Sequence, residues 1–307
     1  MNISLPNASS TSPQRRGFAL ILTLSVLTVV IALTGVLIGY LDTARRDASS
    51  TKALLQANLY FTDVKKIISK FKDKKALYAT LYLTPVPLRS KDGRFSLMLA
   101  CRPTDNAVNI NWLGMGNIPV MKAQYNAAQK VFESLMQSYE VRDPNRLEEM
   151  VIEAINGTQP QEEQSRLRQK NGIISYQQFT QLLSRYQFEA DDVKIGKIPW
   201  KQYFVFQPAS KLPADNLIAG DYLSADLLAM LFNIDKELVK SEWTEAEGAL
   251  KTFLSTQGIP FDKALFAEKF VDRSRCEVTY DYGEERFMFA FIDREGEVKD
   301  FEFYGKQ

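Results

Sequence analysis

The sequence contains no histidine among its 307 residues. This absence excludes a Ser-His-Asp triad, a Cys-His nucleophile pair and a histidine-bound zinc site. It also removes the side chain that most often transfers protons near neutral pH. Carboxylates or lysines alone can still catalyse reactions, so the absence of histidine argues against an enzyme but does not exclude one. The interpretation we favour is a protein with no catalytic residues.

An excess of charge of either sign is also missing. The chain has 38 Lys and Arg against 37 Asp and Glu, a formal net charge of +1. Nucleic-acid binding proteins carry an excess of positive charge, so no nucleic-acid binding is indicated. Hydrophobic residues make up 45% of the chain and charged residues 24%, which is ordinary for a folded globular protein.

Cysteine is scarce, with only Cys101 and Cys276 present. Two cysteines are too few for a tetrahedral metal site and these are too far apart for a C-x-x-C redox motif. Both fall on or beside predicted strands, so a disulfide and a pair of small buried apolar side chains are equally open. A disulfide closing so long a loop would stabilise the fold by about 5 kcal/mol in the chain-entropy model.

Motifs for phosphate, dinucleotide and calcium binding are absent as well. There is no P-loop, no complete G-x-G-x-x-G and no EF-hand loop. Acidic residues do gather in two stretches, and weak calcium candidates among them are Asp191, Asp192, Asp215 and Asp221. We favour surface or helix-capping roles for these carboxylates, so no cofactor is predicted and calcium stays an alternative.

One long apolar run is present, from Phe18 to Leu41, and it contains no charged residue. As a helix this run would rise about 36 Å, enough to cross a hydrocarbon core of about 30 Å. Arg15 and Arg16 precede it, whereas the charges that follow it cancel. The positive-inside rule therefore predicts a single membrane helix, residues 18–41, with a cytoplasmic N-terminus and the rest of the chain outside.

Three interpretations of this segment compete. A cleaved secretory signal would have a shorter apolar region and an A-x-A-like site after it. A plain signal anchor fits the hydropathy but gives no reason for Gly17. The sequence Arg15-Arg16-Gly17-Phe18 followed by a long apolar helix resembles the leader of type IV pilins and pseudopilins. The resemblance implies a leader of residues 1–17, cleavage by a prepilin peptidase between Gly17 and Phe18, and methylation of Phe18.

The residue at the fifth position after this bond is Leu22. Most members of the superfamily carry glutamate there, which is thought to offset the free amine of a neighbouring subunit inside the apolar fibre. An unpaired charge in such surroundings is expensive, so a subunit with nothing above it can lack the carboxylate. Loss of this glutamate is typical of the type II secretion minor pseudopilin K (general secretion pathway protein K family), which this chain resembles.

Beyond Leu41 the apolar spacing predicts that the helix continues to about Lys72. Residues at alternating spacings of three and four form one apolar stripe. The residues of the stripe are Leu54, Ala57, Phe61, Val64, Ile68 and Phe71. A membrane helix that runs on as an amphipathic helix is the plan of a pilin subunit, whereas a generic anchor more often ends in a flexible linker.

After Lys75 the pattern predicts strands, then a long helical block, then strands again. The predicted strands are 79–83, 94–101, a short one within 106–116, 275–282, 285–293 and 297–304, with turns at 91–93, 282–284 and 294–296. The predicted helices are 120–139, one from Asp143-Pro144 to before Gly157, one capped by Ser175 with Gln178, one capped by Ser224, and one capped by Thr244 with Glu247. Residues 200–206 are predicted as a buried strand.

This order predicts an α+β fold, in which a long N-terminal transmembrane and amphipathic helix packs on an antiparallel, pilin-like sheet with a large all-α insertion. The domains expected after the membrane helix are residues 42–118 for the helix continuation and first strands, 119–271 for the helical insertion and 272–307 for the last strands. A large helical insertion in a pilin head is a further resemblance to the K pseudopilin.

The resemblance implies a tip or initiating subunit of a type II secretion pseudopilus, anchored in the bacterial inner membrane with a periplasmic head. Its expected partners are other minor pseudopilins, the major pseudopilin, the prepilin peptidase and the inner-membrane assembly platform. Alternatives are a minor pilin of a DNA-uptake or type IV pilus system, and a single-pass periplasmic enzyme or sensor with an uncleaved anchor.

Overall fold

The structure is a computed structural model of the chain, and it describes residues 14–89, 96–157, 172–282, 285–294 and 296–306. The helices are α1 (Gln14–Lys70), α2 (Lys74–Leu83), α3 (Lys122–Ser138), α4 (Pro144–Asn156), α5 (Tyr176–Ala190), α6 (Trp200–Tyr203), α7 (Ala225–Phe232), α8 (Lys236–Glu242) and α9 (Ala249–Thr256). The strands are β1 (Val86–Arg89), β2 (Ser96–Pro103), β3 (Val108–Asn109), β4 (Phe204–Val205), β5 (Arg273–Tyr282), β6 (Glu285–Arg294) and β7 (Glu297–Lys306).

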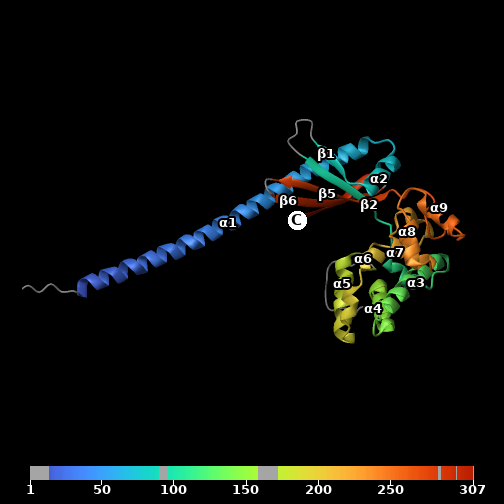
Figure 1. Cartoon of the computed structure of the whole chain (residues 1–307), viewed down its shortest axis with the longest axis horizontal. Coiled ribbons are helices and arrows are strands. Elements are labelled where there is room, and N and C mark those ends of the chain that lie inside the picture. Colours follow the sequence, from blue (N-terminus) through green and yellow to red (C-terminus); the bar gives the residue numbers. More distant parts are fainter. Residues whose placement is uncertain (1–13, 90–95, 158–171, 283–284, 295, 307) are drawn as a thin grey trace, which may run out of the picture.

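The first helix, α1, is unbroken over 57 residues. Its first half projects alone from the molecule, and its second half lies along the sheet (Figure 1). The predicted continuation of the apolar run as an amphipathic helix is confirmed, and it ends two residues before the predicted Lys72. No residue between the two halves departs from the helix, so the projecting half and the packed half belong to one continuous helix.

The packed half of α1 buries a seam against the sheet. Its fully buried side chains are Ala53, Ala57, Tyr60, Val64 and Ile68. The predicted stripe is right for four of its six members, since Phe61 is partly buried and packs against the same core. It is wrong at its two ends, because Leu54 and Phe71 are 37% and 47% exposed. The Tyr280 hydroxyl donates a hydrogen bond of 2.5 Å to the Ala53 carbonyl, which fixes the helix at the edge of the packed region.

The segment predicted as a strand at 79–83 is instead part of the helix α2, and that prediction was wrong. Asp73 caps the helix by accepting a hydrogen bond from the Ala76 amide at 3.0 Å. Tyr78, Leu81 and Tyr82 then lie on one buried face. These residues have the three- and four-residue spacing of a helix, and the β-propensity of Tyr and Leu obscured it.

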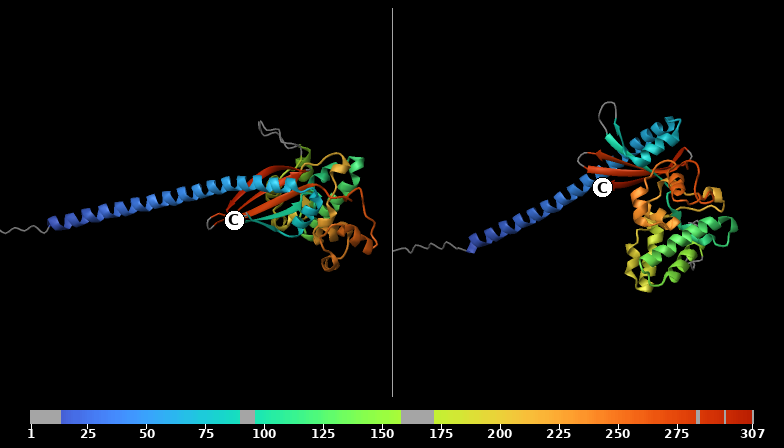
Figure 2. Two further views of the ribbon diagram at one scale, coloured as in Figure 1. Left: turned by 90° about the horizontal axis from the view of Figure 1, so that it is seen from above. Right: turned by 45° about the vertical axis from the view of Figure 1, so that its right-hand side comes forward.

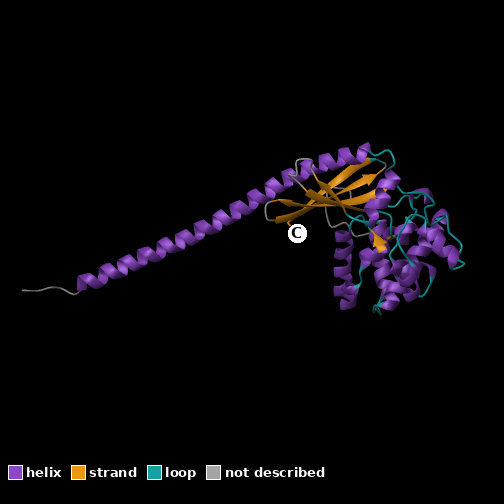
Figure 3. Cartoon of the chain, turned by 45° about the horizontal axis from the view of Figure 1, so that its top comes forward, coloured by secondary structure: helices purple, strands orange, loops and turns teal. Residues whose placement is uncertain are grey.

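The sheet has five antiparallel strands in the order β1-β2-β5-β6-β7. The predicted C-terminal meander is confirmed by β5, β6 and β7, while its two turns contain residues outside the described ranges. The predicted turn at 91–93 lies outside them as well. Strands β2 and β5 are neighbours in the sheet, and the chain between them forms a helical insertion (Figure 3).

Most predicted helices of this insertion are confirmed. Asp143 caps α4, which ends at Gly157 with a φ of 72°, and Ser175 and Ser224 accept hydrogen bonds from the amides of Gln178 and Leu227. The capping box predicted from Thr244 was wrong, because α9 begins only after Gly248. The segment 200–206 is buried as predicted but forms the short helix α6 before the two-residue strand β4.

Two separate apolar cores follow from this arrangement. One lies between α1, α2 and the sheet, and the other lies inside the helical insertion. The insertion occupies the end of the molecule opposite the free part of α1 (Figures 1 and 2). The predicted α+β class, with a long N-terminal helix packed on an antiparallel sheet and a large helical insertion, is confirmed.

Candidate functional site: an apolar helix and the joint behind it

The projecting part of α1 is the largest exposed apolar surface of the described chain. Its most apolar window of 18 residues has a mean hydropathy of 2.7, and none of that window is buried. By length and composition α1 can cross a membrane, and it is the one such helix among the described residues. Leu22, the fifth residue after the predicted cleavage site, is 55% exposed on this surface.

The few polar groups of this apolar stretch are satisfied within the helix itself. The hydroxyls of Thr23, Ser25, Thr28 and Thr34 each donate a hydrogen bond to a carbonyl three or four residues earlier, at 2.8–2.9 Å. Such bonds remove the cost of placing a hydroxyl in an apolar environment. The stretch therefore presents a surface suited to lipid or to other apolar helices.

The residues predicted for processing lie at the start of α1. Gly17 and Phe18 belong to its first turns, as do Arg15 and Arg16. Their side chains lie outside the part of the chain that the structure describes, as do residues 1–13 altogether. The structure therefore tests neither cleavage nor methylation at the Gly17–Phe18 bond.

Behind the apolar helix, α2 is bound to the sheet through a buried carboxylate. Asp293 on β6 is fully buried, accepts a hydrogen bond from the Tyr78 hydroxyl and lies 3.2 Å from the Lys74 Nζ. Tyr82 forms a second hydrogen bond to the sheet, with the hydroxyl of Ser274. Burial raises the pKa of both tyrosines, and the Asp293 carboxylate raises that of Tyr78 further. None of these contacts was foreseen from the sequence.

The two chain segments that connect the sheet to the insertion are bound to each other, and we call this region the neck. Cys101 and Cys276 face each other on β2 and β5 and are joined by a disulfide, with their Cα atoms 4.0 Å apart. Three residues from each cysteine along the chain, the Thr104 amide donates to the Arg273 carbonyl at 3.0 Å. The Arg273 guanidinium in turn donates to the Asp215 carbonyl at 3.2 Å.

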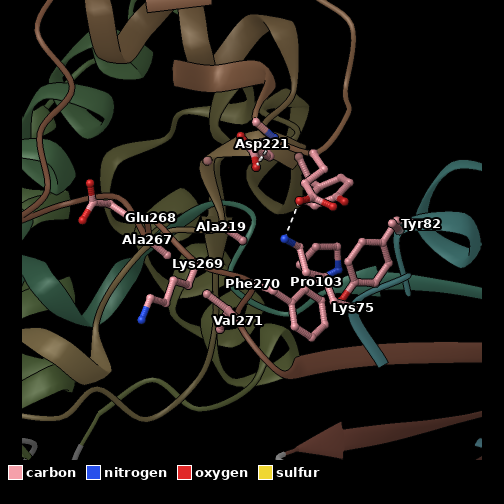
Figure 4. Close-up of a pocket in the computed structure, with 15 residues that line it drawn as sticks. Lys75, Tyr82, Pro103, Ala219, Asp221, Ala267, Glu268, Lys269, Phe270 and Val271 are labelled. Carbon is pink, nitrogen blue, oxygen red and sulfur yellow. Dashed lines mark hydrogen bonds and ion pairs between the residues drawn. The ribbon is translucent and has the colours of Figure 1, made fainter. Parts of the chain in front are cut away.

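A pocket of about 110 Å³ separates α2 from the insertion (Figure 4). Tyr82 and Phe270 form its apolar floor, and Lys75 forms an ion pair with Glu247 at its mouth. Asp221 lies above that pair and accepts hydrogen bonds from the backbone amides of Gly248 and Leu250 at 2.8 and 3.1 Å. Both carboxylates are thus engaged within the chain.

These contacts make α2 and the neck a joint between the two cores. Tyr82 of the first core meets the ring of Tyr222, whose backbone belongs to the insertion, with the ring centroids 4.8 Å apart. Burial raises the pKa of the Tyr222 hydroxyl to about 12. The Tyr82–Tyr222 contact and the Lys75–Glu247 ion pair therefore join α2 to the insertion, and the disulfide joins the two strands between which the insertion lies.

The four aspartates considered for calcium do not form one site. Asp192 accepts hydrogen bonds from the amides of Arg142 and Lys194, while Asp191 is largely exposed beside the Arg142 side chain. Asp215 lies at the neck, and the Asp221 carboxylate accepts hydrogen bonds from the amides of Gly248 and Leu250. Among the described residues no three His, Cys, Asp or Glu side chains are grouped to hold a metal. The structure gives Asp192 and Asp221 capping roles instead.

Comparisons with known proteins found similarity among solved structures only. No model of a known protein family matches the sequence, and no curated protein matches it. The chain is similar to a solved chain of the GspK-GspI-GspJ complex from the type 2 secretion system of enterotoxigenic Escherichia coli. The identity is 12% and the TM-score 0.46, over 84% of this chain and 97% of that chain. The likeness is too distant to assign a function.

Proposed function

We propose that this chain is a minor pseudopilin, the tip or initiating subunit of a type II secretion pseudopilus that takes part in protein secretion. The observation that carries the proposal is the continuity of α1. An uninterrupted helix that is bare and apolar in one half and packed on a sheet in the other can transmit a fixed orientation from a fibre core to a head. A tether for an independent domain needs no such rigidity.

The residues around the start of α1 support a leader and a tip position. Arg15, Arg16 and Gly17 would precede the bond cut by the prepilin peptidase, and Phe18 would become the methylated N-terminus. Leu22 carries no charge, so an apolar fibre core could take it without a compensating amine. A first subunit, with no neighbour above it, needs no carboxylate at this position.

The topology proposed is a single pass through the bacterial inner membrane, with a cytoplasmic N-terminus and a periplasmic head. The basic residues before the apolar stretch favour this orientation. The disulfide between Cys101 and Cys276 supports it, since disulfides form and persist in the periplasm and are rare in the cytosol.

In this role the chain would act by assembly and catalyse nothing itself. Its partners would be the other minor pseudopilins at the tip, the major pseudopilin, the prepilin peptidase and the assembly platform of the inner membrane. The same parts would serve a minor pilin of a DNA-uptake or type IV pilus system. A single-pass periplasmic enzyme or sensor is the candidate from another class.

The mature N-terminus tests the proposal directly. Intact-mass and N-terminal peptide analysis of the chain, expressed with and without a prepilin peptidase, should give a product beginning at methylated Phe18 only when the peptidase is present. A chain that retains Met1 with an active peptidase would rule out the pseudopilin and leave the anchored enzyme or sensor.

The variant Gly17→Ala should block this processing, because cleavage in the leaders that this segment resembles follows a glycine. The matched control, Ser10→Ala, changes a leader residue away from the bond and should be processed as the unmodified chain is. Equal processing of both variants would show that cleavage occurs elsewhere.

A further inference from the structure

The corner between α1 and α2 carries a concentration of positive charge that the fold does not use. Between residues 65 and 75 there are six lysines and one acidic residue, Asp73, in a chain whose net charge is +1. The corner lies where α1 turns into α2, away from the projecting apolar half (Figure 1). We call its free part the lysine elbow, formed by Lys65, Lys66, Lys70 and Lys72 with Ile67 and Phe71.

Two of the six lysines form ion pairs that are part of the joint, and the four lysines of the elbow take no part in it. Lys74 binds Asp293 and Lys75 binds Glu247. Lys66 approaches Asp63 at 3.8 Å with both side chains mostly exposed, which is a weak contact. Within the described parts of the chain, no acidic side chain lies within 4 Å of the other three. Asp73 is engaged by the Ala76 amide as the cap of α2.

Two exposed apolar side chains sit among these lysines. Ile67 is 39% exposed and Phe71 is 47% exposed, although Ile68 between them is buried. Ile67 lies in the last turn of α1, and Phe71 is the first residue after the helix ends. Protein–protein interfaces commonly combine apolar side chains with charged ones at the rim, and the elbow offers both kinds within eight residues. Cations at a helix C-terminus do stabilise the helix dipole, but that gives no reason for the exposed phenylalanine or for Lys72 beyond the helix end.

The position of the elbow excludes the membrane that would hold α1. Lys65 lies 24 residues beyond Leu41, about 36 Å along the helix. This is several times the Debye length of about 8 Å at physiological salt, so the headgroups around the apolar stretch would not attract it. A nucleic acid fits less well than a protein, because a near-neutral chain with four exposed lysines at one corner offers a small footprint for a polyanion.

We propose that the lysine elbow is a docking surface for an acidic polypeptide segment that places carboxylates on the lysines and an apolar side chain against Ile67 and Phe71. The proposal does not rest on fibre assembly, since it is argued from side chains that are exposed on the single chain. Charge complementarity would supply fast association, and the two apolar side chains would supply the shorter-range contact.

The test measures binding of a short fluorescein-labelled peptide of glutamates with two leucines to the detergent-solubilised full chain, by fluorescence anisotropy at two salt concentrations. The variant combines K65E, K66E, K70E and K72E. The matched control reverses four exposed lysines of the insertion that form no ion pair among the described residues, namely K122E, K197E, K211E and K251E. Oligonucleotides of equal charge, single-stranded and duplex, serve as the competing ligand.

We expect the unmodified chain and the control to bind the peptide equally, with an affinity that falls as salt rises, and the elbow variant to lose about tenfold or more. Phe71→Ser should weaken binding without changing its salt dependence. Lys-to-Gln changes at the same four positions give a milder variant if the charge reversal prevents folding. The proposal is overturned if the peptide does not bind, if the control loses as much as the elbow variant, or if an oligonucleotide binds more tightly than the peptide.

Discussion

Asp293 shows how much one buried side chain contributes to the head. Its carboxylate is fully buried, and one oxygen serves both the Tyr78 hydroxyl and the Lys74 ammonium. The other oxygen, Oδ1, has no hydrogen-bond partner among the described residues. A buried charge that loses a hydrogen-bond donor cannot replace it with water. Removing one of its few donors therefore lowers the free energy of unfolding by more than removing an average hydrogen bond does.

The variant Tyr78→Phe should therefore lower the free energy of unfolding by about 1–3 kcal/mol, because it leaves the Asp293 carboxylate with one donor fewer. Urea unfolding followed by circular dichroism measures the change. Tyr176→Phe is the control, since the hydroxyl of the half-buried Tyr176 forms no hydrogen bond with the described residues, and it should cost less than about 0.5 kcal/mol. Equal effects of the two variants would contradict the role given to Asp293.

Several buried tyrosines also predict how stability depends on pH. Burial raises the pKa of Tyr222 and Tyr280 to about 12, and raises those of Tyr78 and Tyr82 as well. In the unfolded chain these hydroxyls ionise near pH 10. A raised pKa in the folded state means that the stabilisation is complete below about pH 10 and is lost as pH rises toward 12.

We expect the free energy of unfolding to be constant between pH 8 and 9 and to fall steeply above about pH 10. Absorbance at 295 nm reports tyrosinate, so part of the signal should appear only together with unfolding. If all tyrosines ionised near pH 10 while circular dichroism stayed native, the buried hydrogen bonds of α2 would not exist in solution.

At the scale of elements, α1 is a rod that spans two environments. Residues on the sheet side, such as Ala57 and Val64, are buried, while the same helix is exposed from Leu20 to Ala48. The small side chains Ala53 and Ala57 let the helix axis approach the sheet closely. Rigidity of this rod is the property on which the assembly role depends.

Spin labels at Thr43→Cys and Lys66→Cys measure that rigidity in the solubilised chain by double electron–electron resonance. The native cysteines are joined in a disulfide, so they do not take the label. A continuous helix predicts one narrow distance distribution near about 35 Å. Ala48→Pro should broaden and shorten it because proline breaks the helix, and Ala48→Ser should not. A broad distribution in the unmodified chain would contradict the rod.

At the scale of the whole molecule, two cores are held together by a small neck. The disulfide closes a loop with a sequence separation of 175 and sits where the insertion leaves and rejoins the sheet. Without it, the antiparallel pairing of β2 with β5 and the hydrogen bond from Thr104 to Arg273 would still join the two segments. The disulfide therefore adds stability to a region that borders both cores.

The double variant Cys101→Ala/Cys276→Ala should lower the free energy of unfolding by about 2–5 kcal/mol, because the open chain gains loop entropy. Urea unfolding with and without reductant measures it. Reductant should destabilise the unmodified chain by a similar amount and leave the double variant unchanged. If reductant had no effect on the unmodified chain, the neck would owe its stability to other contacts.

Local patterns were enough to predict most elements. The period of the apolar residues and the capping groups at Asp143, Ser175 and Ser224 predicted the long helix, the helices of the insertion and the final meander, because each depends on neighbours within a few residues. Helix α2 was missed although Asp73 offered a cap, because tyrosines and leucines favour both helix and strand, and burial against the sheet chose between them.

Contacts between distant parts of the chain could not be read in the same way. The pairing of Cys101 with Cys276 was one of two open outcomes until β2 and β5 were found side by side. Asp221 capping α9, Asp293 under α2 and the ion pair of Lys75 with Glu247 join residues far apart in sequence. Such contacts arise when elements with matching faces are brought together in three dimensions, and no local pattern in the chain encodes which faces will meet.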